Sequence, residues 1–186
     1  RPPRSTLFPY TTLFRSLYAI TYDFYEDDPS IESVVEMMLE QTQNVVGKYF
    51  DQIEELGFSI HETLTFASII EKETGSLEQR NEIASVFHNR LKEGMPLQTD
   101  PTVLYALGEH KDRVLYEDLE VASPYNTYYV TGLPIGPISN FGESALEAVV
   151  NPTDSEYLYF LHDHEGNIHF AKTLEEHNAN IAKYRN

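Results

Sequence analysis

The stretch Leu64–Thr74 most constrains how the rest of the chain can fold; it reads LTFASIIEKET. It predicts a short apolar helix that carries two glutamates two residues apart, directly before a glycine. At about 100° per residue, Phe66, Ile69, Ile70 and Glu73 fall within about 100° of one another on one helix face. The pattern therefore places one of the two carboxylates inside the apolar stripe of the helix.

Glu73 is the carboxylate in this stripe, whereas Glu71 projects to its flank. Burying a carboxylate among apolar side chains disfavours the charged form and raises the pKa. General-acid catalysis needs an acid that is still protonated near neutral pH. The same position also fits an ion pair with a nearby arginine, such as Arg80 or Arg90. The helix pattern alone leaves both interpretations open.

Length and composition bound the class of protein. The chain has 186 residues, which is long enough for one well-buried domain. Its hydrophobic content of 41% argues against disorder, and its net charge of −17 argues against a nucleic-acid backbone as a partner. The absence of cysteine fits an extracytoplasmic bacterial protein without establishing the compartment. The sequence has no apolar run of about 18 residues, so it predicts no membrane-spanning helix.

Residues 1–16 stand apart from the rest of the chain. Thr6–Ser16 reads TLFPYTTLFRS, which looks like the in-frame translation of a sequencing-library adapter. We therefore expect residues 1–16 to be non-native and the natural sequence before about residue 17 to be missing. Residues 17–186 show no internal boundary and are expected to form one domain.

Cap, glycine and periodicity signals predict an α+β fold: a helix-rich domain with a small β-sheet of hairpins and a Pro/Gly-rich cleft loop over Ser123–Gly142. The expected elements are a strand at Leu17–Tyr25, one long helix from Asp28-Pro29 to Gly57, the central apolar helix, a helix from a capping box at Ser76 and Gln79 to Gly94, a helix capped by Asp100 that runs to about Leu107, a short helix at Gly142–Val150, a hairpin of Tyr157–His162 with Asn167–Ala171, and a closing helix at Thr173–Tyr184.

Two groups of polar residues are candidates for binding. Gln98-Thr99-Asp100 and Tyr125–Tyr128 place amides, hydroxyls and aromatic rings on loops, which is the usual equipment for holding sugars. Turn and cap chemistry explains the same residues equally well, and Asp100 in particular fits a helix cap.

The histidine-rich hairpin is the candidate for a metal site. His162 and His164 would point the same way in a hairpin, with Asp163 between them and His169 on the next strand. These residues flank a turn, where polar side chains are expected in any case, and no third ligand follows at a firm spacing. We expect no metal and no other cofactor, and keep a metal-dependent hydrolase as an alternative.

Five segments carry a resemblance to a known family. ASIIEKET, NRLKEGMPLQTDPTVLYALG, SPYNTYYVTGLPIGPI, NPTDSEYLYF and TLEEHN occur in order between residues 20 and 186. Together they resemble the YceG-like (MltG-type) endolytic murein transglycosylase family, in its catalytic C-terminal portion. The family's membrane anchor and LysM-like subdomain would lie upstream, so the resemblance implies a place on the extracytoplasmic face of the bacterial membrane.

The resemblance implies an enzyme that cleaves the bond between N-acetylmuramic acid and N-acetylglucosamine inside nascent peptidoglycan strands, leaving 1,6-anhydro ends. The partners it implies are glycan strands and cell-wall synthases. The family's catalytic glutamate is the second Glu of the EKE motif and falls on Glu73. Residues expected to bind sugar and shape the cleft are Glu71, Gln98, Asp100, Asn126 and Tyr128. A non-catalytic glycan-binding or scaffold module of the cell-wall machinery is the alternative from another class.

Overall fold

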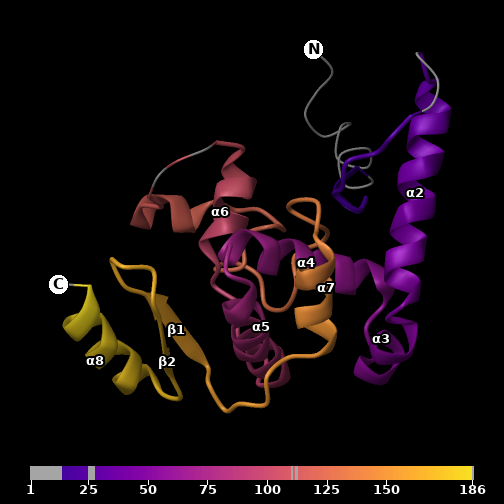
Figure 1. Ribbon diagram of the computed structural model, residues 1–186. Helices are drawn as coiled ribbons and strands as arrows, with labels where there is room; N and C mark the ends of the chain where they lie inside the picture. The colour runs from indigo at the N-terminus through magenta and orange to yellow at the C-terminus, as the bar shows by residue number, and fades with distance from the viewer. Residues whose placement is uncertain (1–13, 25–27, 110, 112, 186) are drawn as a thin grey trace.

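A computed structural model describes residues 14–24, 28–109, 111 and 113–185 (Figure 1). The predicted α+β class is confirmed, with helices dominating and one two-stranded sheet among the described elements. The elements follow in the order α2 (Ile31–Gly47), α3 (Phe50–Leu56), α4 (Ile60–Glu73), α5 (Leu77–Lys92), α6 (Asp100–Leu107), the 3-10 helix η2 (Tyr116–Glu120), α7 (Glu143–Val150), β1 (Tyr159–His162), β2 (Ile168–Ala171) and α8 (Leu174–Tyr184).

The predicted apolar helix is confirmed as α4, which runs through the middle of the molecule with α7 packed along it (Figure 1). It begins earlier than expected because Ser59 and Glu62 form a capping box. The Glu62 backbone N–H donates to Ser59 Oγ at 3.2 Å, and the Ser59 N–H donates to Glu62 Oε2 at 2.8 Å. All eight residues from 63 to 70 are buried, so α4 is covered all round and not along one stripe.

The core is formed where α4, α5 and α7 meet. Phe66 of α4 and Leu146 of α7 are fully buried, and Phe87 of α5 is 1% exposed. Fully buried alanines on α7, Ala145 and Ala148, let its backbone approach α4 closely. The centre of the domain is therefore a rigid three-helix unit, and α4 ends at its surface.

Two expectations for the first third of the chain are wrong. Of the described part of Leu17–Tyr25, Tyr18 alone pairs, through an isolated bridge to Phe141. The long helix expected up to Gly57 is broken into α2 and α3 around Lys48 and Tyr49. Contacts with α7 stabilise this break. Lys48 Nζ lies 2.7 Å from a carboxylate oxygen of Glu143 on α7, and Tyr49 Oη lies 3.3 Å from the same oxygen.

Two expected caps also differ. The N-cap of α2 is Ser30, whose hydroxyl accepts from the Ser33 N–H at 3.1 Å, and not Asp28. Ser76 is the N-cap of α5 but makes no side-chain capping bond, because Gln79 instead accepts from Thr74 Oγ1 at 2.9 Å. No helix among the described residues has the length and apolar character needed to cross a membrane.

The hairpin and the closing helix are confirmed. β1 and β2 pair antiparallel, with Tyr159 opposite Ala171 and His162 opposite Ile168. Gly166, at a φ of 85°, makes the turn. The last helix, α8, packs against both strands on the side of the molecule away from α2 (Figure 1).

Candidate active site

Glu73 is the last residue of α4, at the point where the buried helix reaches the surface. Thr74 ends the helix with an extended backbone, at φ −150° and ψ 141°. The Glu73 side chain is half-buried, and its Oε1 accepts a hydrogen bond from Thr99 Oγ1. The core therefore fixes the backbone of Glu73 at the end of the helix, next to the segment that carries Thr99.

The surroundings of Glu73 favour its protonated form. Burial raises the pKa of Glu73 to about 7, the Thr99 hydrogen bond opposes this increase, and the charge of Asp100 adds to it. The carbonyl groups of the last turn of α4 also disfavour a negative charge at that end of a helix. The raised pKa expected from the helix pattern is confirmed.

The arginine that was the alternative partner of Glu73 pairs with Glu71 instead. Arg80 Nη2 lies 3.0 Å from Glu71 Oε1, and the Gly142 N–H donates to Glu71 Oε2 at 3.0 Å. A Cβ on residue 142 would lie 3.1 Å from that same oxygen, so a glycine lets the loop come this close. These contacts tie α4 to α5 and to the start of α7, which gives Glu71 a structural role beside any part in binding.

The segment that carries Thr99 is fixed by backbone contacts. The Gln98 N–H donates to the Thr127 carbonyl at 3.1 Å, and the Thr99 N–H donates to Thr127 Oγ1 at 3.1 Å. Gln98 has a φ of 53°, in the left-handed region, and its side chain is exposed. The two polar groups singled out in the sequence, around residues 98–100 and 125–128, therefore lie side by side next to Glu73.

Arg90 holds the other side of this segment from the interior. Its Nη1 donates to the carbonyls of Pro96 at 3.1 Å and Leu97 at 2.8 Å, and lies 3.3 Å from Gln98 Oε1. Its Nε donates to the Leu158 carbonyl at 2.6 Å. Arg90 thus joins the end of α5 to β1 and to the loop before Thr99.

Asp100 and Tyr128 form the next contact along the same wall. Tyr128 Oη donates to Asp100 Oδ1 at 2.8 Å, and burial followed by that hydrogen bond raises the pKa of Tyr128. Asp100 is the first residue of α6, whose N-cap is Thr99, so the expected capping role of Asp100 is wrong. Its carboxylate is exposed and is therefore available to a ligand.

Asn126 lies inside the loop. It is fully buried, its Nδ2 donates to the carbonyls of Leu119 and Val121 at 2.8 Å each, and its Oδ1 accepts from the Tyr128 N–H at 2.9 Å. Both amide hydrogens are used within the protein, so Asn126 shapes the cleft loop and presents no amide to solvent.

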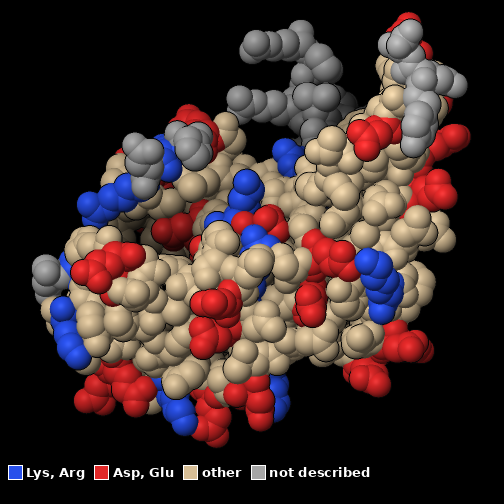
Figure 2. Space-filling model, viewed as in Figure 1, with Lys and Arg blue, Asp and Glu red and all other residues tan. Residues whose placement is uncertain are grey.

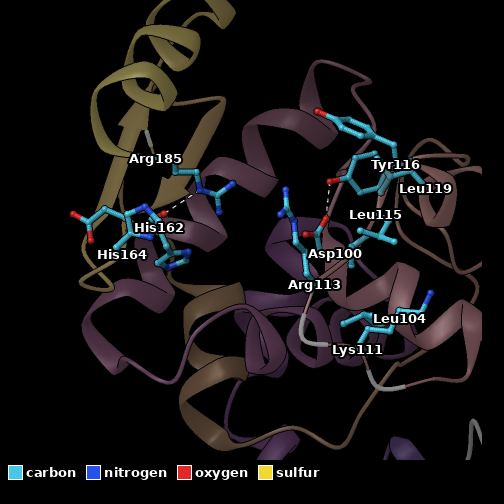
Figure 3. A pocket seen from close by; sticks show the side chains of 13 residues that line it. Asp100, Leu104, Lys111, Arg113, Leu115, Tyr116, Leu119, His162, His164 and Arg185 are labelled. Carbon is cyan, nitrogen blue, oxygen red and sulfur yellow. Dashed lines mark hydrogen bonds between the residues drawn. The ribbon is translucent and has the colours of Figure 1, made fainter.

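A cavity of about 820 Å³ opens beside Asp100 and Tyr128. Its opposite wall is formed by the hairpin and the end of the chain, with His162, His164 and Arg185. The close-up shows these side chains facing Asp100 and Arg113 across the space (Figure 3). Figure 2 shows a hollow on this face, with acidic atoms inside it and basic atoms on its rim. Glu73 and the cavity therefore share the wall formed by the start of α6.

The model of the YceG-like family matches residues 6–183. The chain belongs to this family. That match begins within residues 1–16, the segment that the sequence predicts to be non-native.

Two curated relatives carry a functional name. The chain is 52% identical over 168 residues to the endolytic murein transglycosylase of Bacillus subtilis, covering 90% of this chain and 47% of the relative. It is 37% identical over 176 residues to that of Streptococcus pneumoniae strain D39, covering 91% and 32%. The chain thus spans at most about half the length of the curated relatives it matches.

A solved structure supports the fold of this YceG-like chain. A crystal structure of a yceG-like protein from Listeria monocytogenes superimposes with a TM-score of 0.83 at 47% identity, covering 94% of this chain and 62% of the other.

The histidines in and around the hairpin of this YceG-like chain do not gather around one point. His169 Nε2 lies 2.9 Å from Asp163 Oδ2, and its ring stacks on Tyr184 at 3.6 Å between centroids. His162 and His164 line the cavity instead. Among the described residues, no three His, Asp or Glu side chains are placed to hold a metal ion together.

Thr99, Thr127 and Arg90 complete the site, and the sequence did not predict the contacts that they make. Thr99 lay within a segment already singled out, but its bond to Glu73 joins residues 26 positions apart. The sequence does carry a signal for Arg90, because it is an arginine among the apolar positions of α5, and it is 7% exposed in the structure. A buried arginine must find acceptors, and here backbone carbonyls supply them.

Proposed function

We propose that this chain carries the catalytic part of an endolytic murein transglycosylase, with Glu73 as its single acid and base. The main support is the carboxyl group of Glu73, which has a pKa of about 7 and accepts a hydrogen bond from Thr99, the residue before Asp100 on the wall of an open cavity. The names of the relatives from Bacillus subtilis and Streptococcus pneumoniae support the choice of substrate.

In the proposed reaction, protonated Glu73 donates its proton to the glycosidic oxygen between N-acetylmuramic acid and N-acetylglucosamine. The bond from that oxygen to the anomeric carbon breaks, and positive charge develops on the muramic ring. The Glu73 carboxylate then takes the proton of the 6-hydroxyl of the same ring as this oxygen attacks the anomeric carbon. The products are a free N-acetylglucosamine 4-hydroxyl and a 1,6-anhydro end.

One carboxylic acid suffices for this route because the nucleophile belongs to the substrate. An internal hydroxyl gains the effective-molarity advantage of proximity and needs no bound water. Glu71 and Glu73 have separate surroundings, since Glu71 is paired with Arg80, so they do not form the carboxylate pair of ordinary glycosidases. Exposed Asp100 lies where a negative charge would stabilise the developing cation.

The place of action follows from the proposed substrate. Glycan strands lie outside the cytoplasmic membrane, so we propose that the chain acts on the extracytoplasmic face, next to the synthases that make new strands. Gln98, Asp100 and Tyr128 present side chains near Glu73 and are the proposed sugar-binding groups, with Glu71 and Asn126 shaping the cleft.

Product analysis of Glu73→Gln tests the proposal. We expect the unmodified chain to convert purified glycan strands to fragments with 1,6-anhydro ends, detected by mass spectrometry, and Glu73→Gln to lose at least about a thousandfold in rate while still binding the strands. Glu82→Gln is the matched control, because Glu82 is exposed on α5. It should behave like the unmodified chain.

Three results would contradict the proposal. Cleavage by Glu73→Gln at the unmodified rate would remove Glu73 from the chemistry. Reducing ends in place of anhydro ends would indicate hydrolysis, and loss of activity with EDTA would favour a metal-dependent hydrolase. Binding without any cleavage by the unmodified chain would support the scaffold alternative.

A further inference from the structure

Two arginines from distant parts of the chain point into the cavity beside Glu73. Arg113 follows α6, and Arg185 follows α8 at the end of the chain. Figure 3 shows the two guanidinium groups directed toward the same space from opposite walls. Both side chains are exposed.

Asp163 and Lys111, which also line the cavity, are paired within the protein, whereas exposed Asp100 shares only a hydrogen bond with Tyr128. Asp163 accepts from His169 and from Asn167, and its pKa is lowered by those bonds. Lys111 pairs with Asp118 at 2.6 Å. Asp100 accepts from Tyr128.

Within the described part of the chain, neither Arg113 nor Arg185 lies within 4.0 Å of a carboxylate oxygen. The Nε of Arg185 donates to the carbonyl of His162 at 3.3 Å, which orients the guanidinium without neutralising it. Two guanidinium groups with no carboxylate partner among the described residues therefore line one cavity, in a chain whose net charge is −17. An anionic ligand would be attracted to both of them.

The shape of the arginine side chain selects the ligand. A guanidinium group presents paired N–H donors that match the two oxygens of a carboxylate, and such charge-assisted bonds are about twice as strong as neutral ones. The proposed substrate carries carboxylates on the peptide stem that branches from the same N-acetylmuramic acid ring that Glu73 would act on. An extended stem of five residues spans at most about 18 Å, so its carboxylates can reach a cavity that shares a wall with Glu73.

We propose that Arg113 and Arg185 bind the carboxylates of the peptide stem, so that the chain prefers strands that carry peptides over strands stripped of them. This inference rests on the proposed function. The arginines act as specificity-determining residues, because they would bind the substrate at a distance from the bond that breaks.

Kinetics on two substrates test the preference. The substrates are glycan strands with their peptide stems and the same strands after the stems have been removed by an amidase. We expect Arg113→Gln and Arg185→Gln each to lower kcat/KM about tenfold on peptide-bearing strands, through KM, and to leave stripped strands unaffected. Lys92→Gln also removes one positive charge, at an exposed position on α5 outside the cavity, and should change kcat/KM on neither substrate. Equal losses on both substrates, or no preference by the unmodified chain, would overturn the proposal.

A binding experiment separates failure of this inference from failure of the proposed function. A synthetic stem tetrapeptide is titrated into the isotopically labelled chain and followed by NMR, which requires no catalysis. We expect saturable binding that weakens about tenfold in each arginine variant, stays unchanged in Lys92→Gln, and disappears when the carboxylates of the peptide are amidated. Equal binding of the amidated peptide, no binding at all, or binding indifferent to both arginines would overturn the inference, whatever the outcome for Glu73.

Discussion

Three opposing effects set the protonation of the Glu73 carboxyl group. Removal from water favours the neutral acid, the Thr99 hydroxyl favours the carboxylate, and Asp100 favours the acid again. The result is an acid with a pKa of about 7, near the pH at which it would donate its proton. Ionisation of an acid with a raised pKa lowers the free energy of unfolding.

That cost predicts a pH-dependent stability difference. The pKa of Glu73 rises from an ordinary 4.5 to about 7 on folding, so between these values the folded state binds more protons than the unfolded state. The contribution of Glu73 to stability is therefore fully present below pH 4.5 and is lost as the pH rises through 7. Glu73→Gln removes this titration. The unfolding free energy of Glu73→Gln minus that of the unmodified chain should therefore rise by about 1–3 kcal/mol from pH 5 to pH 8.

Urea denaturation at pH 5 and pH 8 measures this difference. Glu82→Gln should show no comparable change with pH, because Glu82 is exposed. A difference between Glu73→Gln and the unmodified chain that is the same at both pH values would show that Glu73 titrates normally.

At the scale of elements, Arg90 links helix α5, strand β1 and the loop before Thr99. Its planar group bonds the carbonyls of Pro96, Leu97 and Leu158 at the same time. Lysine has a single ammonium group and lacks the rigid fork needed to keep these acceptors satisfied. Arg90 is therefore a positioning residue for the loop that holds Glu73.

We expect Arg90→Lys to lower the unfolding free energy by about 2–3 kcal/mol and to reduce kcat more than it raises KM. The reason is that Thr99, which is hydrogen-bonded to Glu73, would move relative to it. A shift in the pH at which kcat falls would accompany the loss, and a merely destabilised protein would not show such a shift. Unchanged kcat with reduced stability would limit Arg90 to a structural role.

Local signals explain which elements the sequence could predict. The apolar run of α4, the proline that starts α6 and the turn around Gly166 all act within a few residues, and these elements were found. The break between α2 and α3 depends on Glu143, which lies 95 positions after Lys48, and no local pattern reports it. Helical phase predicted that Glu73 lies on the apolar face of its helix, whereas its contact with Thr99 depends on how α6 packs beside α4.

At the scale of the whole molecule, burial is unevenly distributed. Helix α4 lies in the middle with residues 63–70 buried, while α8 has no buried residue and packs on the hairpin at one side (Figure 1). The cavity is lined by α6 and the segment after it on one side and by the hairpin and Arg185 on the other.

Hydrogen exchange should report this difference. Amides of α8 are expected to exchange at least about tenfold faster than those of Phe66–Ile70, because α8 can open without exposing the core. Adding the stem tetrapeptide should slow exchange in α8 near Arg185 and leave α4 unchanged. Uniform exchange over both helices would show that the hairpin and α8 unfold only together with the core.

The pKa of Glu73 itself is the most direct test of the account. NMR titration of a chain labelled with ¹³C at the glutamate carboxyl groups, with the Glu73 signal assigned by its loss in Glu73→Gln, measures that value without substrate. We predict a carboxyl that titrates with a pKa of about 7. A pKa near 4.5, the ordinary value for a glutamate, would contradict the claim that Glu73 is a protonated acid at neutral pH.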